Sequence, residues 1–251
     1  MTNLKDSNSQ RADRVKKLGW LVAIIILLVV IADQWLKIWV KTNFYLGEEL
    51  DILPWFKLKF IENNGFAFGI EWLNKYVLTF GRILAVVFFI WAMRKLLRLT
   101  RNNEVTYQTD DKKDETSSTV SYRLSTGFFV AFALIIAGAA GNIFDCVFYG
   151  EIFTNPYPPE IAQIFPVHGY AGWFEGRVVD MLYFPFFSFT WPSWIPGLGG
   201  KEYEFFQYIF NIADASICVG VALLILFFSS DCSKAFNAVF DKTEKNESKS
   251  K

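Results

Sequence analysis

Asparagine and aspartate side chains spaced three residues apart, inside otherwise apolar segments, are the groups in this sequence best suited to chemistry. Asn142 and Asp145 form one such pair, and Asn211 and Asp214 form another. Residues three apart share a helix face, so each pair would project from one side of a helix. A carboxylate at membrane depth costs about 2.5–3.5 kcal/mol on insertion scales, which makes it a functional candidate. Polar contact between helices is the alternative, and the small residues around both pairs are compatible with it.

Three further polar positions extend this set. Asp33 and Lys37 are four residues apart, which predicts a structural ion pair on one helix face. Asp180 follows a loop in EGRVVDMLYF, where it is either a surface carboxylate or a group that faces Asp214. Asn63, in FIENNGF, either belongs to an ordinary turn or directs its amide, a donor and an acceptor, into the same site.

Paired carboxyl groups indicate acid–base chemistry on water. Two close carboxyls share a proton, because like charges at short range do not both ionise. The ionised carboxyl then acts as a base on water while the protonated one donates to a carbonyl, which is aspartyl peptide hydrolysis. A proton relay in a transporter uses the same residue types, and composition does not separate the two.

Other chemistries find little support in the residue types. The chain has one histidine, His168, in a proline-rich segment, and three scattered cysteines. A surface or packing role is therefore expected for His168. We also expect no metal site, no disulfide framework and no cofactor.

Four long apolar segments would carry the polar residues across a membrane. The chain has 251 residues, of which 53% are hydrophobic and 20% charged. About 20 helical residues cross a bilayer core of about 30 Å. The predicted spans are about 18–40, 76–93, 124–148 and 205–230. The formal net charge of +0 gives no indication of nucleic-acid binding. The sequence thus predicts a single integral membrane domain over 1–251.

Lysine and arginine counts predict the orientation of these spans. The N-terminal tail carries five basic residues, the loop 94–123 seven and the C-terminal tail five, whereas the segments 41–75 and 149–204 together carry six. Both termini are therefore expected in the cytoplasm, with 41–75 and 149–204 outside. The polar stretch 102–122 and the last residues, 241–251, are expected to be flexible.

The two outer segments differ in character. Alternation of apolar and polar residues within 44–62 predicts short strands. Residues 149–204 are rich in Pro, Gly, Trp and Phe. They predict an irregular segment on the membrane surface, where Trp and Tyr are favoured.

Five short motifs contain the polar residues of interest. They are DQWLK at 33–37, NNGFAFG at 63–69, GAAGNIFD at 138–145, GRVVD at 176–180 and FNIADASI at 210–217. In this order and with four spans, they resemble bacterial lipoprotein signal peptidase, also called signal peptidase II. The resemblance covers about 18–230, without the 102–122 loop and parts of 149–204. It implies an all-α membrane fold of four transmembrane helices, with a small extracytoplasmic β-structured region and a periplasmic loop or surface helix.

The resemblance also implies an activity. The implied enzyme is an aspartyl peptidase of the bacterial inner membrane, with its active site at the outer face. It removes the signal peptide from diacylglyceryl-modified prolipoproteins by cutting directly before the lipidated cysteine. It assigns the catalytic pair to Asp180 and Asp214. The family's other polar positions fall on Asn63, Asn142, Asp145 and Asn211 around the site and on Asp33 and Lys37 in the first span. Membrane lipids surround such an enzyme, it needs no cofactor, and we expect a monomer.

The chain departs from the family pattern in two places. Cys146 follows Asp145, where the family usually has arginine. We hypothesise that Arg177 supplies the missing guanidinium. An insertion at about 150–175 is expected to cover the site or to shape substrate entry.

Two other functions stay open. A small carrier could use Asp33, Asp145 and Asp214 as a proton path. Those residues cluster near one membrane face, however, and the second span offers only Arg82. A catalytically inactive scaffold of the same fold is the other alternative, and the departure at Cys146 keeps it open.

Overall fold

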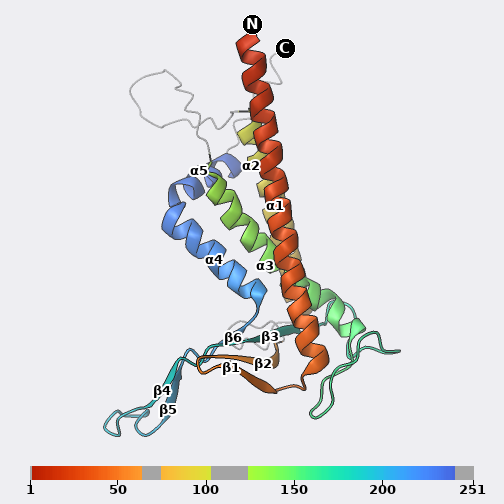
Figure 1. Cartoon of the computed structure of the whole chain (residues 1–251), viewed down its shortest axis with the longest axis vertical. Coiled ribbons are helices and arrows are strands. Elements are labelled where there is room, and N and C mark those ends of the chain that lie inside the picture. The colour runs from red at the N-terminus through yellow and green to blue at the C-terminus, as the bar shows by residue number, and fades with distance from the viewer. Residues whose placement is uncertain (1, 64–74, 103–123, 241–251) are drawn as a thin grey trace. The chain divides into compact units, whose positions relative to one another are not determined.

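The computed structural model describes residues 2–63, 75–102 and 124–240 (Figure 1). Most of the predicted flexible loop 102–122 and the whole of the predicted tail 241–251 lie outside the described residues. The chain forms two compact units, and each is described by itself. Unit 1 contains Met1–Leu28, Ala85–Ala137 and Ser216–Lys251, and unit 2 contains Val29–Leu84 and Gly138–Ala215.

Three of the described helices are long and apolar enough to cross a membrane. They are α1 (Thr2–Asn43), α2 (Lys75–Asn102) and α3 (Thr126–Ile152). Leu27, Leu28 and Trp35 on α1 are 59%, 60% and 67% exposed. Large apolar side chains in such positions suit contact with lipid. The first three predicted spans are therefore confirmed as candidate membrane helices.

The fourth predicted span, 205–230, is only partly helical. α4 (Ile212–Phe227) and α5 (Ser229–Phe240) meet at a bend of 99° and count as a fourth span only as a broken pair. α4 alone has 16 residues, which is about 24 Å of helix and shorter than a hydrocarbon core of about 30 Å. Just before α4, Ile209 and Phe210 form a strand, because they pair with Tyr183 and Leu182 in the sheet of unit 2.

The loop predicted at 94–123 also begins later than expected. α2 continues to Asn102, because Arg94, Lys95 and Arg98 are good helix formers and extend the helix beyond its apolar part. Basic residues marked the end of the apolar run in the sequence, but they do not mark the end of the helix.

Unit 2 contains an antiparallel sheet with the strand order β1-β2-β3-β6. The strands are β1 (Glu49–Leu53), β2 (Phe56–Asn63), β3 (Val178–Tyr183) and β6 (Ile209–Phe210). The strands expected within 44–62 are confirmed as β1 and β2. Phe60, Val179 and Met181 of this sheet share an apolar core with Tyr149 of α3 and with Phe153, which directly follows that helix.

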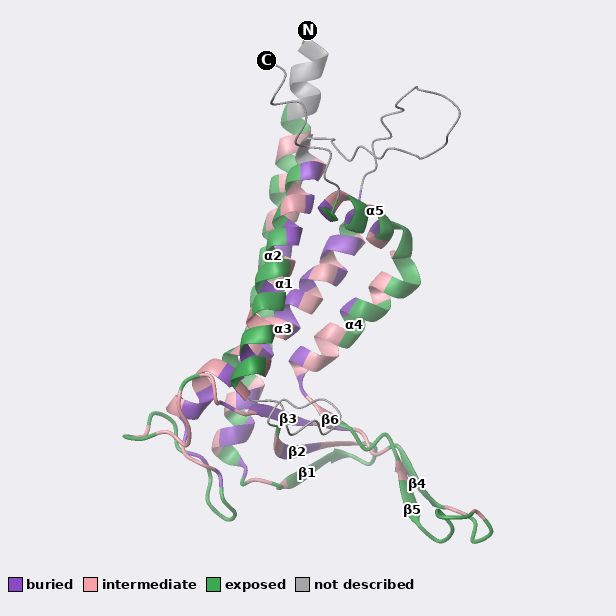
Figure 2. Ribbon diagram, turned by 180° about the vertical axis from the view of Figure 1, so that it is seen from behind, coloured by how far each residue is buried: buried purple, intermediate pink, exposed green. Residues whose placement is uncertain are grey.

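The second outer segment is more regular than predicted. Besides β3 it holds β4 (Phe187–Thr190) and β5 (Glu202–Phe205), which form a separate two-stranded ribbon. Residues 153–211, all of them described, contain no helix. The surface helix is therefore not found there, because the apolar stretch around Asp180 pairs with β2 as a strand. In Figures 1 and 2 the ribbon projects from the end of the four-stranded sheet.

Unit 1 is an apolar helical core. α5 buries Asp231, Ala235 and Val239, which lie at successive turns on one face. Phe128 and Phe129 of α3 belong to the same core. The Asp231 carboxylate accepts a hydrogen bond from the Ser125 N–H at 3.0 Å, which ties α5 to the start of α3.

Candidate active site

Asp180 and Asp214 lie in different kinds of element of unit 2. Asp180 is in β3 and only 2% exposed, whereas Asp214 is in the first turn of α4 and partly exposed. The register of β2 against β3 pairs Ile61 with Asp180 and Asn63 with Val178. One carboxyl is thus held in a buried strand and the other at a helix start that solvent reaches.

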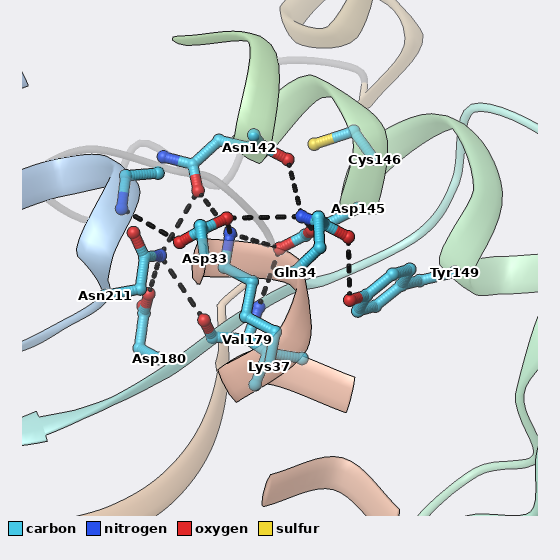
Figure 3. Close-up of polar contacts among 12 residues, drawn as sticks. Asp33, Gln34, Lys37, Asn142, Asp145, Cys146, Tyr149, Val179, Asp180 and Asn211 are labelled. Atoms are coloured by element: carbon cyan, nitrogen blue, oxygen red, sulfur yellow. Dashed lines mark hydrogen bonds and ion pairs between the residues drawn. The ribbon is translucent and has the colours of Figure 1, made fainter. Parts of the chain in front are cut away.

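Two asparagines bridge the two carboxyl groups. The Asn211 Nδ2 group donates to Asp180 Oδ1 at 2.6 Å and to Asn142 Oδ1 at 3.2 Å. The Asn142 Nδ2 group donates in turn to Asp214 Oδ1 at 2.7 Å. Figure 3 shows Asn211 between Asp180 and Asn142. The four residues therefore form one continuous polar chain.

Asn211 also determines where α4 begins. Its Oδ1 accepts the N–H of Asp214, the third residue of the helix, at 2.8 Å. This is the hydrogen bond of an N-cap residue. Asn211 therefore precedes the helix and does not share its face with Asp214, contrary to the prediction from their spacing.

Lys37 lies at the centre of the buried charges. Its ammonium contacts Asp145 Oδ2 at 2.7 Å, Asn142 Oδ1 at 2.8 Å and Asp33 Oδ2 at 2.9 Å. The side chains of Lys37, Asp33 and Asp145 are at most 1% exposed. The ion pair predicted between Asp33 and Lys37 is present, and Asp145 joins it. All three ammonium protons have an acceptor, as a buried lysine requires.

Asp33 and Asp145 each hold a backbone group next to one carboxyl of the candidate pair. Asp33 Oδ1 accepts the N–H of Ala213 at 2.8 Å, beside Asp214. Asp145 Oδ2 accepts the N–H of Val179 at 3.3 Å, beside Asp180. The two carboxylates thereby connect α1 to the start of α4 and α3 to β3, so they fix the backbone from which the pair projects.

Gln34 belongs to the same network, and the sequence analysis missed it. Its Nε2 group donates to Asp145 Oδ1 at 2.8 Å and to the Gly141 carbonyl at 3.2 Å. Its Oε1 accepts from the Tyr149 hydroxyl at 3.0 Å. The available signal was a second polar residue directly after Asp33 inside an apolar span, where polar side chains are costly.

The electrostatics of the site favour a protonated Asp180. Burial, as the largest cause, and the nearby charge of Asp214, as the second, together raise the pKa of Asp180 to about 7. Lys37 and the hydrogen bonds from Asn211 and Asn63 oppose this shift. Below about pH 7 the Asp180 carboxyl is therefore mainly protonated.

Comparison with known proteins decides the family. The family model described as signal peptidase (SPase) II matches residues 25–109 and 117–229, which include every residue of this polar network. The chain belongs to the signal peptidase II family. This assignment makes it a member of a family of membrane peptidases.

Relatives match most of the chain. The lipoprotein signal peptidase of Porphyromonas gingivalis (strain ATCC BAA-308 / W83) is 42% identical over 211 residues, 84% of this chain and 83% of that protein. That of Amoebophilus asiaticus is 35% identical over 212 residues, 80% of this chain and 75% of that protein. A bacterial membrane enzyme solved by the in meso method at 1.9 Å is 24% identical, with a TM-score of 0.48, over 82% of this chain and 90% of that one.

The departure at Cys146 from the signal peptidase II pattern is accompanied by an arginine from another helix. Cys146 is buried, and the Arg82 Nη1 group of α2 donates to its sulfur at 3.3 Å. A guanidinium therefore does lie next to position 146, although it comes from Arg82 in α2 and not from the residue after Asp145. Arg82 is the single charged residue of the predicted second span, and its position in the sequence gives no sign of this contact.

Arg177, which was expected to serve the active site, is held by other groups. Its Nη1 contacts Glu62 Oε2 at 2.9 Å and Asn155 Oδ1 at 3.1 Å. Its guanidinium lies 5.0 Å from the Tyr170 ring centre. Lys41, fully buried, is the second cation paired with Glu62. Arg177 thus directly precedes β3, and its guanidinium pairs with Glu62.

These contacts involve the segment at about 150–175, which the resemblance implies to be an insertion. Asn155 and Tyr170 belong to the insertion, and both contact Arg177. Glu62 directly precedes Asn63 in β2. The insertion is therefore fastened to the strand that lies beside Asp180. His168, within the same segment, is exposed.

The described residues offer no cluster of three or more His, Cys, Asp or Glu that could hold a metal ion. The three cysteines are free.

Gly141 is predicted to be intolerant of a side chain. A Cβ at this position would lie 2.7 Å from Asp33 Oδ2 and 3.2 Å from the Ala213 Cβ. Gly141→Ala is expected to lower the free energy of unfolding by about 1–3 kcal/mol, because it overpacks the point where α1, α3 and α4 approach. Thermal unfolding in detergent measures this.

Gly81→Ala is the matched control for that substitution. Gly81 is also helical, and a Cβ there would meet nothing within 4 Å. Gly81→Ala is expected to leave the free energy of unfolding of the protein equal to that of the wild type, or to raise it by up to about 1 kcal/mol. Equal unfolding temperatures for the two variants would contradict the close approach at Gly141.

Proposed function

We propose that the protein removes the signal peptide from diacylglyceryl-modified prolipoproteins, cutting directly before the lipidated cysteine. We further propose that Asp180 and Asp214 form the catalytic pair. The observation that carries the second proposal is the bridge of Asn211 and Asn142 between a buried and a partly exposed carboxyl. Family membership and relatives named lipoprotein signal peptidase support the first.

The different surroundings of the two carboxyls suggest their roles. Asp180 is the buried member with the raised pKa, so it holds the shared proton in the resting site. Asp214, the partly exposed member, acts as the base and takes a proton from a water molecule as that water attacks the scissile carbonyl carbon. Asp180 donates its proton toward the developing oxyanion. The C–N bond then breaks and the leaving amine receives the proton held by Asp214. As the carbonyl re-forms, the hydroxyl of the tetrahedral intermediate returns its proton to Asp180, so the pair is back in its starting state.

The surrounding residues orient the two carboxyl groups. Asn142 and Asn211 set the direction of the two carboxyls, and Asn63 donates to Asp180. Asp145 and Lys37 keep this framework compact and neutralise part of its charge. In the carrier alternative Asp33 and Asp145 would move protons, yet both are held by Lys37 and by backbone N–H groups. That arrangement favours hydrolysis.

The proposed location follows from the substrate. The lipid chains of a prolipoprotein lie in the bilayer, whereas hydrolysis needs water, so the site belongs at the outer membrane–water boundary of the inner membrane. The excess of Lys and Arg in both tails and in 94–123 supports cytoplasmic termini and an outward-facing site. Apolar surfaces of the spans would hold the diacylglyceryl chains, with no cofactor and no second subunit.

A gel-shift assay tests the activity. Purified wild-type protein in detergent is given a diacylglyceryl-modified prolipoprotein and, separately, the same prolipoprotein without lipid. We expect cleavage of the lipidated form alone, and mass spectrometry should find the lipidated cysteine as the new N-terminal residue. Equal cleavage of both forms, or none by folded protein, would overturn the proposal.

The rate is expected to decline on the alkaline side of about pH 7. The raised pKa of Asp180, about 7, means that this carboxyl loses its proton there and can no longer donate to the oxyanion. The value of kcat/KM between about pH 5.5 and about pH 9 measures this, with unfolding followed at each pH. A rate that stays constant from about pH 6 to about pH 9 contradicts the role of Asp180 as the proton donor.

A further inference from the structure

The ribbon of β4 and β5 has one aromatic face. Its register pairs Phe187 with Phe205 and Phe189 with Tyr203. Because side chains alternate along a strand, these four residues point to the same side, and Trp191 continues the row. Ring centres are 4.9 Å apart for Phe187 and Phe205, 5.4 Å for Phe189 and Tyr203, and 5.0 Å for Phe189 and Trp191. We call these five residues the aromatic face.

The opposite face of the ribbon is polar. The same register pairs Ser188 with Glu204 and Thr190 with Glu202. The Glu204 carboxylate accepts a hydrogen bond from the Tyr183 hydroxyl of β3. The polar face is therefore attached to the main sheet at the ribbon's base, which determines the side to which the aromatic face turns.

The described residues leave the aromatic face largely uncovered. Phe187, Phe189, Tyr203 and Phe205 are 37–55% exposed, and Figure 2 shows the ribbon as exposed along most of its length. A two-stranded ribbon on its own is marginally stable in water. A contiguous exposed apolar surface marks an interaction site. The aromatic face is therefore expected to contact an apolar surface outside the described residues.

We propose that the aromatic face lies in the interfacial layer of the bilayer, in the leaflet next to the sheet of unit 2. The ribbon is tied to the membrane through α4, which begins seven residues after Phe205, a reach of at most about 24 Å. Residues 185–200 contain no charged residue. Trp194, between the two strands, is 79% exposed. Aromatic side chains favour the membrane–water interface.

The charges of the ribbon suit this placement. Glu202 and Glu204 are on the polar face, so neither carboxylate enters the lipid when the aromatic face does. Lys201 is exposed, and a lysine at an interface extends its ammonium toward the headgroups. A bilayer surface can therefore cover the aromatic face while both carboxylates stay on the side of the water.

Spin labels on the two faces of β5 test the placement. In a background with Cys146, Cys218 and Cys232 replaced by alanine, Tyr203→Cys labels the aromatic face and Glu202→Cys the polar face. Both are read in nanodiscs by collision with oxygen, which concentrates in lipid, and with a water-soluble nickel complex. Thermal unfolding confirms that each variant is folded.

We expect the ratio of oxygen to nickel accessibility to be several-fold higher at position 203 than at 202. Equal nickel accessibility at both positions would show an aromatic face in water and would overturn the proposal. So would a label at 203 shielded from both reagents, which would indicate a protein partner or a second copy of the chain. Neither result depends on peptidase activity, so this test is separate from that of the proposed function.

Discussion

Asp180→Asn is expected to lower kcat for prolipoprotein cleavage by at least about 10³-fold, because one carboxyl of an acid–base pair is lost. The same variant should be more stable than the wild type at about pH 8. The amide has the shape of the carboxyl but never ionises in its buried position. A residue that lowers the stability of the fold and is nevertheless required for turnover is expected to have a functional role.

The sign of the stability effect follows from the pKa. Folding raises the pKa of Asp180 from 3.8 to about 7. The wild type therefore loses stability as the pH rises from about 4 to about 7, because the unfolded chain releases this proton first. The shift of about three units corresponds to at most about 4 kcal/mol, which Asp180→Asn should recover above pH 7 and not at about pH 4.

Asp51→Asn is the matched control for both measurements. Asp51 lies in β1 of the same sheet, and its side chain is 75% exposed. The substitution should change neither turnover nor the pH dependence of unfolding. Turnover of Asp180→Asn within twofold of this control would remove Asp180 from the proposed mechanism, as would a stability difference between the two that does not depend on pH.

Lys37→Met is expected to destabilise the protein by about 3–5 kcal/mol, the cost of breaking a buried ion pair on one side. Methionine fills much of the same space but leaves Asp33 and Asp145 buried without their cation. Thermal unfolding in detergent measures the loss. Activity should fall with it, because the two carboxylates hold the backbone beside Asp214 and Asp180.

Two variants separate charge from packing at Lys37. Lys57→Met removes a partly exposed lysine that pairs with Glu49 and Asp51, and it should leave the unfolding temperature close to that of the wild type, because surface ion pairs contribute little to stability. Adding Asp33→Asn to Lys37→Met removes one of the two uncompensated charges, so it should restore part of the stability. A double variant less stable than Lys37→Met would show that the ammonium does not act through charge.

Local patterns in the sequence predicted the local parts of this fold. The first three membrane helices follow from long apolar runs, β1 and β2 from alternation within 44–62, and the pair of Asp33 and Lys37 from a spacing of four. Each of these features depends on residues near one another in the chain. None of them needs knowledge of a distant partner.

The start of α4 depends on distant partners and was placed too early. Residues before Asn211 are as apolar as those after it, so hydropathy shows no boundary there. β6 forms because Phe210 pairs with Leu182, 28 positions away. Asn211 then caps the helix. Tertiary pairing overrides a local apolar signal of this kind.

The candidate site was predicted as a set of residues and not as a network. Spacing brought Asn142 and Asp145 together on one helix, but nothing local indicates that Asp145 meets Lys37 and Gln34, more than 100 positions away. Arg177 was assigned by its nearness in sequence to the family's aspartate. Its guanidinium lies at Glu62, because buried Glu62 offers it a carboxylate oxygen that Lys41 does not occupy.

The central claim, that Asp180 and Asp214 together activate water, is tested most directly by one cleavage experiment. Wild type, Asp180→Asn and Asp214→Asn are purified in the same detergent, shown to be folded by thermal unfolding, and given diacylglyceryl-modified prolipoprotein at about pH 6.5. We predict cleavage by the wild type and none by either variant within the time of complete wild-type turnover. Cleavage by folded Asp214→Asn at a rate close to that of the wild type would contradict the claim.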